Sequence, residues 1–445
     1  MRFSFLPAIA LATAGILLLS SCATSRHAER RFAKKIQKEV EKSPVFNRAF
    51  TGFTLLDPET GKTLTDINGD KYFTPASNTK ILTLATCLEM LGDSVPALSY
   101  YHLGDSLVFR ATGDPTFLNP NFNYWQKGYH FLLQSPAKRI FEKSYQGHLK
   151  RFGPGWAWED YEYDYSTRRE KFPLFGGLMR LSAVRPDSLK IEPDYFRKLL
   201  RPVPWDSGYF SITEVEHFIY YSTKTRFPSD YERFIPINWQ QFISDHRLWD
   251  ILGRPVFGGY GLPEPDTMST LYSTPLDTVL RRMMYQSDNF IAEQMLLVCA
   301  GQKFDILQQD TIIKWMLDSV LTSLPQRPRW VDGSGLSRYN LISPRDLAQV
   351  LFKLWKEQPR EFLLSLFPAG GVNGTVADFY KGKNGKPYVF AKTGGMSGVH
   401  CLSGYVVCKS GKTLIFSFMH NNFVGSNRAW KEEMQRILEM IREGN

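Results

Sequence analysis

Hydrophobic and polar positions at the start of the chain follow the period of a helix and then that of strands. Three apolar residues recur every four positions and share one face of a helix predicted to begin at residue 31: Phe32, Ile36 and Val40. Two strand-like runs follow at residues 49–56 and 63–67, with turn-forming residues between them. A long apolar run at residues 81–91, which Gly92 ends, predicts a buried helix.

The last part of the chain repeats these patterns in a clearer form. Residues 388–394, 399–408 and 413–420 are predicted strands, and the charged amphipathic segment 428–442 is a predicted helix. Three more helices are predicted nearer the centre, at residues 274–285, 290–300 and 344–355. Strands and a helix at both ends predict an α/β (α+β) fold, in which one antiparallel sheet is shared by both termini and covered by helices.

The stretch between residues 99 and 266 has a different character. It is rich in Tyr, Trp, Phe, Pro and charge, with short strand-like pieces, turn signals and no periodic repeat. We interpret residues 99–266 as a large inserted β-rich region of one or two domains. Residues 31–98 and 267–445 then form the main domain that the insert interrupts.

The first residues have the features of an export signal. Arg2 precedes a mostly apolar stretch at residues 6–19, and small residues then lead to Cys22. The pattern resembles a bacterial lipobox, so we expect residues 1–21 to be removed and Cys22 to carry lipid above a tether of residues 22–30. An ordinary signal peptide with a coincidental cysteine is the alternative. Because Ala23 follows the cysteine, the pattern also resembles sorting to the outer membrane, on the periplasmic side.

Composition changes this picture little. The 445 residues are 43% hydrophobic and 22% charged, which excludes a disordered or collagen-like chain. Only one apolar run is long, which excludes a polytopic membrane protein. The net charge of +10 hints at an acidic partner, but dispersed Lys and Arg are usually a solvated surface. No nucleic-acid-binding motif is present, and we expect no nucleic-acid partner.

The first candidate chemistry opens the predicted helix at residues 81–91. Residues i and i+3 of a helical turn share a face, so the amine of Lys80 can reach the hydroxyl of Ser77. A serine is a poor nucleophile until a neighbouring base takes its proton, and a lysine is such a base once burial lowers its pKa. The same spacing recurs at Ser135 and Lys138, but no long apolar helix follows it, so we treat that copy as coincidental.

A second short motif, Ser287-Asp288-Asn289, lies between two predicted helices. A hydroxyl and a carboxamide in such a turn can donate hydrogen bonds to a substrate and relay a proton. The same residue types are also common helix N-caps, which is the alternative interpretation.

A third motif, Lys392-Thr393-Gly394, lies in the predicted strand at residues 388–394. A strand edge offers backbone groups to an extended peptide, Lys and Thr can bind a carboxylate, and Gly permits close approach. A lysine on a sheet edge before a turn is the alternative.

The order and chemistry of the three motifs resemble the serine penicillin-recognising enzymes. Further segments match in the same order: Pro75-Ala76-Ser77-Asn78-Thr79-Lys80, Gly113-Asp114-Pro115-Thr116, residues 153–161, Asp332-Gly333-Ser334-Gly335-Leu336-Ser337 and Gly371-Val372-Asn373-Gly374-Thr375. Together they resemble the class C low-molecular-mass penicillin-binding proteins, the D-Ala-D-Ala carboxypeptidase/endopeptidase family. The resemblance runs from about residue 46 to residue 420 and is weakest at residues 174–260.

This resemblance implies a fold and a role for each motif. The fold is a transpeptidase-like, β-lactamase-like domain with a helical subdomain, and the extra domains lie between the first two motifs. The substrate is the peptidoglycan stem peptide, β-lactams are inhibitors and no cofactor is required. The implied catalytic residues are Ser77 as nucleophile, Lys80 as base and Ser287 as proton relay; the substrate-binding residues are Asn289, Lys392, Thr393 and Gly394; the oxyanion hole is the backbone N–H of Ser77 and of Gly395.

One departure and three alternatives stay open at this stage. Gly395 stands where many relatives have Thr or Ser, and the missing hydroxyl favours cleavage of cross-links over trimming of free ends. A serine β-lactamase shares the motifs, but no E-x-x-x-N-like segment follows the second one. A non-catalytic wall-binding scaffold needs no intact motifs, whereas here all are intact. A zinc peptidase needs closely spaced ligands, and the eight histidines form neither H-x-H nor H-x-x-x-H, so we expect no metal.

Overall fold

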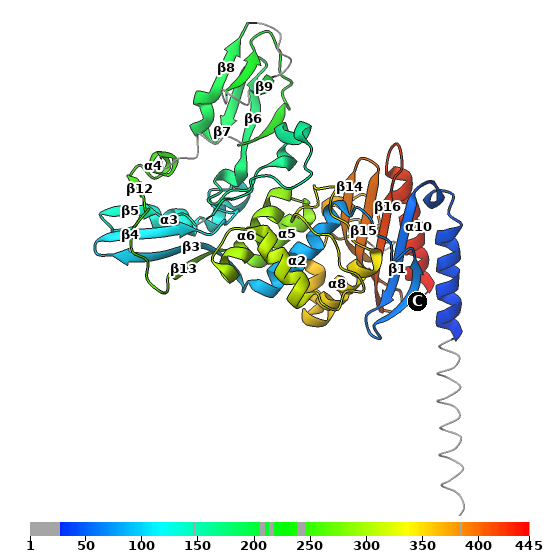
Figure 1. Ribbon diagram of the computed structural model, residues 1–445. Helices are drawn as coiled ribbons and strands as arrows, with labels where there is room; N and C mark the ends of the chain where they lie inside the picture. The colour runs from blue at the N-terminus through cyan, green and yellow to red at the C-terminus, as the bar shows by residue number, and fades with distance from the viewer. Residues whose placement is uncertain are drawn as a thin grey trace, which may run out of the picture. The chain divides into compact units, whose positions relative to one another are not determined.

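The computed structural model describes residues 27–145, 147–204, 210–212, 218–237, 246–382 and 385–444. The chain divides into two compact units (Figure 1). The first unit consists of Met1–Pro75, Leu324–Pro328 and Leu341–Asn445, and the second of Ala76–Ser323 and Arg329–Asn340. The predicted export signal and Cys22 lie outside the described residues.

A five-stranded antiparallel sheet with the strand order β14-β15-β16-β1-β2 is the centre of the first unit. Its strands are β1 (Phe50–Asp57), β2 (Lys62–Ile67), β14 (Val389–Met396), β15 (Val399–Val407) and β16 (Thr413–Asn421). Because β1 pairs with β16, the sheet joins the first and last parts of the chain. The predicted shared sheet is therefore confirmed, and its strand bounds agree with the predicted ones to within two residues.

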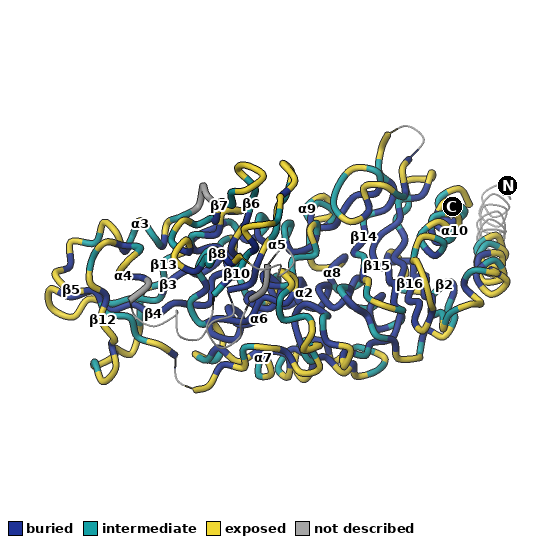
Figure 2. Tube along the Cα trace, turned by 90° about the horizontal axis from the view of Figure 1, so that it is seen from above, coloured by how far each residue is buried: buried dark blue, intermediate teal, exposed yellow. Residues whose placement is uncertain are grey.

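Helices cover both faces of this sheet. Figure 1 shows α8 (Pro344–Glu357) on one side of the strands and α10 (Arg428–Gly444) on the other. Successive side chains of a strand point to opposite faces, so a strand covered on both sides must be apolar throughout. On β15, Tyr405 faces α8 and donates to the carbonyl of Leu351 at 2.9 Å, while Leu402 belongs to the core that α10 covers. Figure 2 accordingly shows β15 and β16 as buried along almost their whole length.

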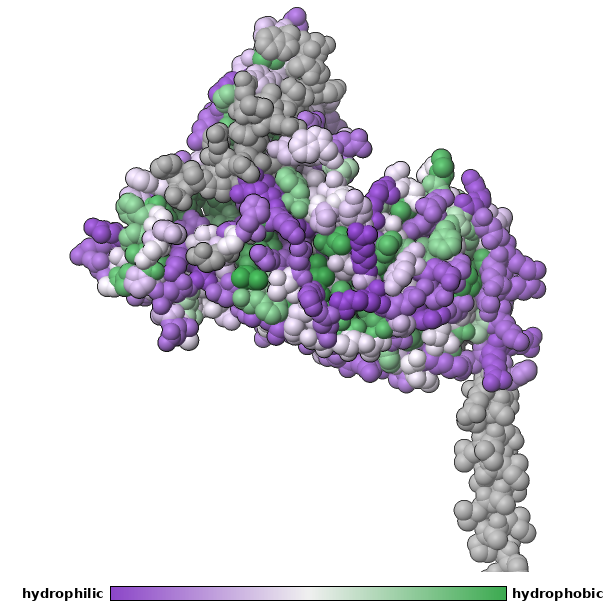
Figure 3. All heavy atoms as spheres, in the orientation of Figure 1, coloured by the Kyte–Doolittle hydropathy of each residue, from purple (hydrophilic) through white to green (hydrophobic). Residues whose placement is uncertain are grey.

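A further helix at residues 27–41 packs on the same core, with Ile36 and Val40 buried beside Met434. Its remaining positions are largely charged and solvent-accessible, and Figure 3 shows this region as mainly hydrophilic. The helix begins before the predicted start, so the last residues of the expected tether are helical. Among the helices that the described ranges contain, none has both the length and the apolar character needed to cross a bilayer.

The second unit contains the helical subdomain. Its longer helices are α2 (Lys80–Met90), α5 (Leu276–Tyr285), α6 (Asn289–Phe304) and α7 (Gln309–Trp315). The short helix α9 (Arg360–Ser365) belongs to the first unit instead. Helix α6 is buried on every side from Phe290 to Gly301, and its residues there are apolar except for Glu293 and Gln294. It packs against α2, so the residues at the N-termini of these two helices are brought together.

The insert is rich in strands, as predicted. One sheet has the order β12-β5-β4-β3-β13, and two three-stranded sheets have the orders β11-β6-β7 and β8-β10-β9. The bounds are β3 (Ser94–Leu103), β4 (Ser106–Ala111), β5 (Arg139–Glu142), β6 (Leu178–Arg185), β7 (Ser188–Glu192), β8 (Leu200–Val203), β9 (Phe210–Ile212), β10 (Ile219–Ser222), β11 (Glu232–Pro236), β12 (Val256–Gly258) and β13 (Ser269–Pro275), with helices α3 (Lys127–Leu133) and α4 (His246–Leu252). Residue 99, the expected start of the insert, lies within β3, and the unit boundary groups α2, α5 and α6 with the insert.

Candidate active site

The first motif forms a short 3-10 turn, η2 (Ala76–Thr79), that leads directly into α2. Ala76 has φ = 46°, a left-handed conformation that is strained for a residue with a Cβ. Ser77 is half-buried, whereas Lys80 is fully buried. The Nζ atom of Lys80 lies 2.9 Å from Oγ of Ser77, so the contact that the spacing predicts is present. The hydroxyl is therefore accessible while the amine beneath it is shielded from water.

Three acceptors surround the amine of Lys80. Besides Ser77 Oγ, they are Asn289 Oδ1 at 2.6 Å and the carbonyl oxygen of Ser334 at 2.7 Å. The amide group of Asn289 is oriented by its Nδ2 atom, which donates to the carbonyl of Tyr165 at 2.9 Å. Asn289 Oδ1 and the Ser334 carbonyl can only accept, so they take the two N–H bonds of a neutral amine. The lone pair then faces Ser77 Oγ, which is the geometry a base needs.

Burial lowers the pKa of Lys80 from its ordinary value to about 8. Three carboxylates oppose this effect and raise the pKa, in the order Glu293, Asp332 and Asp288. Near neutral pH a substantial minority of the molecules therefore hold Lys80 as a neutral amine, which a solvent-exposed lysine does not provide. The electrostatic environment thus supports the assignment of Lys80 as a base.

The carbonyl of Ser334 reaches Lys80 because two glycines flank it. A Cβ on Gly335 would lie 1.9 Å from the carbonyl oxygen of Ala76, and Gly335 has φ = +82°. A Cβ on Gly333 would lie 2.5 Å from the carbonyl oxygen of Ala292 in α6. Only glycine permits both approaches. The loop at residues 332–335 is therefore inserted between α6 and the turn that carries Ser77.

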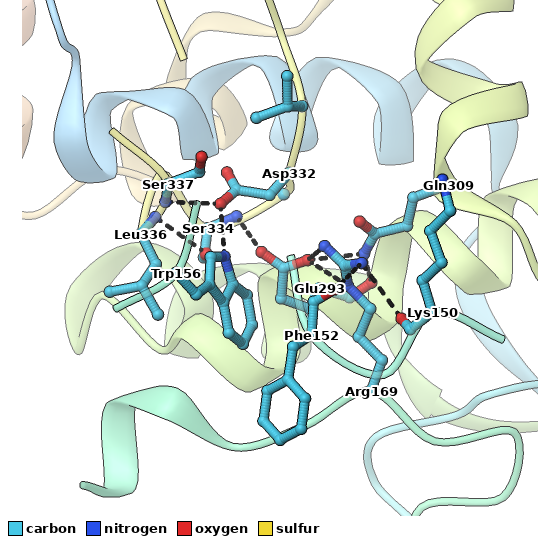
Figure 4. Close-up of polar contacts among 12 residues, drawn as sticks. Lys150, Phe152, Trp156, Arg169, Glu293, Gln309, Asp332, Ser334, Leu336 and Ser337 are labelled. Carbon is cyan, nitrogen blue, oxygen red and sulfur yellow. Dashed lines mark hydrogen bonds and ion pairs between the residues drawn. The ribbon is translucent and has the colours of Figure 1, made fainter. Parts of the chain in front are cut away.

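Asp332 holds this loop in shape. One carboxylate oxygen accepts from the backbone N–H of Gly335 at 2.9 Å and the other from that of Ser337 at 2.7 Å. The side chain of Asn340 donates to the same carboxylate at 2.7 Å, and that of Trp156 does so at 3.0 Å (Figure 4). Burial and the nearby Glu293 raise the pKa of Asp332 to about 6. Asp332 thus positions the loop through four hydrogen bonds rather than by contact with the nucleophile.

The second motif begins α6. Asp288 is its N-cap and accepts from the backbone N–H of Ile291 at 3.0 Å, so the N-cap interpretation is correct for this residue. Ser287 precedes it with φ = 58°, an uncommon conformation that marks a constrained turn. Ser287 and Asn289 line a cavity of about 540 Å³ together with Tyr165 and residues of the insert. Because both polar atoms of the Asn289 carboxamide contact the protein, this residue positions Lys80 as well as facing the cavity.

The third motif lies on β14 in the first unit. Lys392 is fully buried, and its Nζ donates to the carbonyl of Thr393 at 2.9 Å. The hydroxyl of Thr393 donates to that of Thr375 at 2.6 Å, which connects the strand to the predicted segment at residues 371–375. Gly394 is paired with Cys401 on β15. The next residue, Gly395, is exposed, and a Cβ there would meet no atom within 4 Å.

Other sequence-based interpretations have mixed outcomes. In the coincidental copy of the first motif, Lys138 is exposed and pairs with Asp105 at 2.9 Å. Of the two tryptophans in residues 153–161, Trp156 is partly buried and donates to Asp332, whereas Trp158 is 74% exposed. In the described part of the chain no group of three or more His, Cys, Asp or Glu is arranged to hold a metal ion.

Sequence reasoning missed two residues of this centre. Ser334 contacts Lys80 through a backbone carbonyl, which no residue type encodes, although the glycines beside it signalled a close approach. Glu293 is a buried carboxylate one helical turn after Asn289, and its charge acts on Lys80. The available signal was an acidic residue within an otherwise apolar helix.

Known proteins resemble this chain in sequence. The sequence matches the D-Ala-D-Ala carboxypeptidase 3 (S13) family over residues 32–190 and 262–443, and the unmatched interval lies in the region where the resemblance was weakest. The chain is 31% identical over 160 residues to the D-alanyl-D-alanine carboxypeptidase DacB of Haemophilus influenzae, covering 34% of this chain and 33% of that protein. It is 29% identical over 190 residues to the carboxypeptidase DacB of Mycolicibacterium smegmatis, covering 40% of each. The chain thus aligns with about a third to two fifths of these relatives' lengths.

The fold is also found among solved structures. The crystal structure of penicillin binding protein 4 (dacB) from Haemophilus influenzae matches with a TM-score of 0.70 and 19% sequence identity, covering 92% of this chain and 99% of that chain. The predicted fold class is therefore confirmed. Since the family match extends over well more than half of its residues, the chain belongs to the D-Ala-D-Ala carboxypeptidase 3 (S13) family.

Proposed function

We propose that this protein is a serine D-alanyl-D-alanine carboxypeptidase and endopeptidase that acts on peptidoglycan stem peptides through an acyl-enzyme. The observation that carries the proposal is the hydrogen bond between Lys80 Nζ and Ser77 Oγ at 2.9 Å, in a centre where burial lowers the pKa of Lys80 to about 8. Family membership supports the same reaction. The non-catalytic scaffold is not favoured, because nucleophile and base are both present and in contact.

The reaction begins when Ser77 Oγ attacks the carbonyl carbon of the peptide bond between two D-alanines. The hydroxyl proton passes to the neutral amine of Lys80, and the substrate oxygen becomes an oxyanion that backbone N–H groups of Ser77 and Gly395 stabilise. The C–N bond then breaks as the leaving amine takes a proton, which Ser287 relays from Lys80. Water hydrolyses the resulting ester and regenerates Ser77. Lys392 and Thr393 bind the substrate carboxylate, and Asn289 and Gly394 contact the substrate backbone.

A β-lactam would enter by the same route. Attack of Ser77 on the lactam carbonyl opens the ring, and the amine that leaves stays tethered to the acyl group. Because this tethered group stays in the site, water attacks the ester slowly and the acyl-enzyme persists. Ser77 is then blocked and the protein is inhibited.

We also propose that the protein works outside the cytoplasm, as a lipoprotein anchored through Cys22 to a membrane on its periplasmic side, the outer membrane being the expected one. The export-like sequence at residues 1–21 supports this location, and the substrate is found there.

Incubation with a stem pentapeptide ending in D-Ala-D-Ala tests the proposed activity. We expect the wild type to release D-alanine in stoichiometric amount with the tetrapeptide, and Ser77→Ala to release none. A wild type that leaves the pentapeptide intact would disprove the proposal, as would a Ser77→Ala variant of equal activity.

A further inference from the structure

Glu293 is a fully buried carboxylate that the reaction scheme does not use. It lies on α6 four residues after Asn289, and this spacing places both side chains on the same face of the helix. Figure 4 shows it at the centre of a polar cluster that lies behind the loop at residues 332–335. A buried charge is retained only when partners compensate its desolvation, so its contacts are informative.

Three groups bind this carboxylate. Oε2 accepts a hydrogen bond from Nε of Arg169 at 2.8 Å and another from Nε2 of Gln309 at 2.8 Å, and it forms an ion pair with Nη2 of Arg169 at 2.8 Å. Oε1 accepts from the backbone N–H of Ser334 at 2.7 Å. Burial favours the protonated form of Glu293, but Arg169 and these hydrogen bonds outweigh it and hold its pKa below the ordinary value. Glu293 is therefore a carboxylate at neutral pH.

The contact with Ser334 connects Glu293 to the catalytic base. The N–H of Ser334 donates to Glu293, and the carbonyl of the same residue accepts from Lys80 at 2.7 Å. Moving the carboxylate would therefore move an acceptor of Lys80. Glu293 is also the carboxylate that raises the pKa of Lys80 most. It thus acts on the base through geometry and through charge.

The charged groups facing this centre come from three segments of the second unit. They are Glu293 on α6, Asp288 at the N-cap of α6, Asp332 on the inserted loop and Arg169 beside Glu293. Arg169 pairs with Glu293, but its positive charge does not cancel the effect of Glu293 on the pKa of Lys80, because the charges that act most on Lys80 are those of the carboxylates. Removing the charge of Glu293 alone should therefore disfavour the ammonium form of Lys80.

We propose that Glu293 is a positioning residue for Lys80: its carboxylate holds the Ser334 backbone that receives the lysine, and its negative charge sets the pH at which the lysine becomes a base. The proposal rests on the proposed function, since it assigns a role within that reaction.

The test is the pH dependence of acylation by a fluorescent penicillin in wild type and Glu293→Gln. Glutamine keeps an acceptor for the Ser334 N–H but lacks the charge. Because the ammonium form loses its strongest attraction, we expect the midpoint of the acid limb to move to lower pH by roughly one unit. A purely structural role would lower the rate or the yield of folded protein without moving this midpoint. An unmoved midpoint would overturn the proposal.

Two further variants control for folding. Glu293→Gln leaves Arg169 buried without its partner, which is destabilising. The double variant Arg169→Gln/Glu293→Gln removes the ion pair as a unit, and we expect the same downward shift. Glu170→Gln is the matched control, because Glu170 is a buried carboxylate that pairs with Arg151 at 2.9 Å and also with Arg168. The midpoint of the acid limb in Glu170→Gln should equal that of the wild type. A shift in this control as large as that of Glu293→Gln would overturn the assignment to Glu293.

A second readout separates this proposal from the proposed function. The titration of Lys80, followed by NMR of ¹³Cε-labelled lysine and assigned with Lys80→Arg, does not depend on acylation. A wild type that penicillin never acylates would disprove the proposed function. In that case the Lys80 midpoint in Glu293→Gln still decides the present proposal: a lower midpoint supports its electrostatic part, and an unchanged one rejects it.

Discussion

Burial of Lys80 lowers the pKa of its amine and at the same time makes the folded protein less stable. The lysine side chain is fully buried, and the pKa of the amine is lowered by burial from 10.5 to about 8. The unfolded chain therefore binds this proton more tightly than the folded one between these two pH values. Below pH 8 the folded protein carries a desolvated ammonium, which costs about 3 kcal/mol relative to an exposed lysine.

The first prediction follows from the lowered pKa of Lys80 in the folded protein. Lys80→Met should abolish acylation at every pH, because no base remains to take the Ser77 proton. The free energy of unfolding of the wild type, measured relative to this variant, should rise by about 3 kcal/mol between pH 8 and pH 10.5 as the lysine becomes neutral. Chemical denaturation of both proteins across this range gives the difference. A constant difference would mean that the lysine has an ordinary pKa.

A second prediction concerns Gly335. Replacing it by alanine places a Cβ 1.9 Å from the Ala76 carbonyl oxygen, at a φ of +82°. We expect a loss of about 3 kcal/mol in unfolding free energy and a loss of penicillin acylation, since the loop is pushed away from Lys80. Gly104 is the matched control in the same unit, with φ = +59° and no atom within 4 Å of its added Cβ. Gly104→Ala should cost only about 1 kcal/mol and keep acylation. Equal effects of the two substitutions would show that the close approach is unimportant.

At the scale of elements, the helices and strands with the strongest periodic patterns were the ones predicted most closely from the sequence. The strands β14, β15 and β16 and the helix α10 match their predicted ranges closely, because long alternating or amphipathic runs leave little ambiguity. The insert was predicted only as β-rich, since strands as short as β9 and β12 carry too few residues to show a period.

The candidate site divides in the same way. Ser77 and Lys80 were predictable from their spacing on one helical turn, and residues 392–394 from their motif. The contacts of the Ser334 carbonyl and the Glu293 carboxylate were not predictable, because the local sequence marks an unusual position but does not identify its partner in a distant segment. Such contacts arise only when α2, α6 and the loop at residues 332–335 pack together.

The third prediction concerns Gly395, the residue of β14 that follows the third motif. The position is exposed and open, so Gly395→Thr is sterically allowed and adds a hydroxyl next to the motif. We expect this hydroxyl to favour substrates with a free terminal carboxylate, and therefore to raise the ratio of carboxypeptidase to endopeptidase activity. Muropeptide digestion followed by chromatography measures both activities in one sample. An unchanged ratio would remove Gly395 as a determinant of specificity.

At the scale of the whole molecule, the fourth prediction concerns the N-terminus. If Cys22 carries lipid, Cys22→Ala should move the protein from the membrane fraction to the soluble fraction of the bacterial cells that express it. The helix at residues 27–41 buries Ile36 and Val40 in the core of the first unit, and most of its other positions are solvent-accessible. A Cys22→Ala protein that stays with the membranes would contradict the lipoprotein assignment.

The central claim is that Ser77 is an acylating nucleophile activated by Lys80, and the intact mass of the purified protein after incubation with benzylpenicillin tests it most directly. The account predicts that the wild type gains the mass of one benzylpenicillin molecule and that Ser77→Ala gains none. A wild type that forms no adduct while the benzylpenicillin stays intact would contradict it.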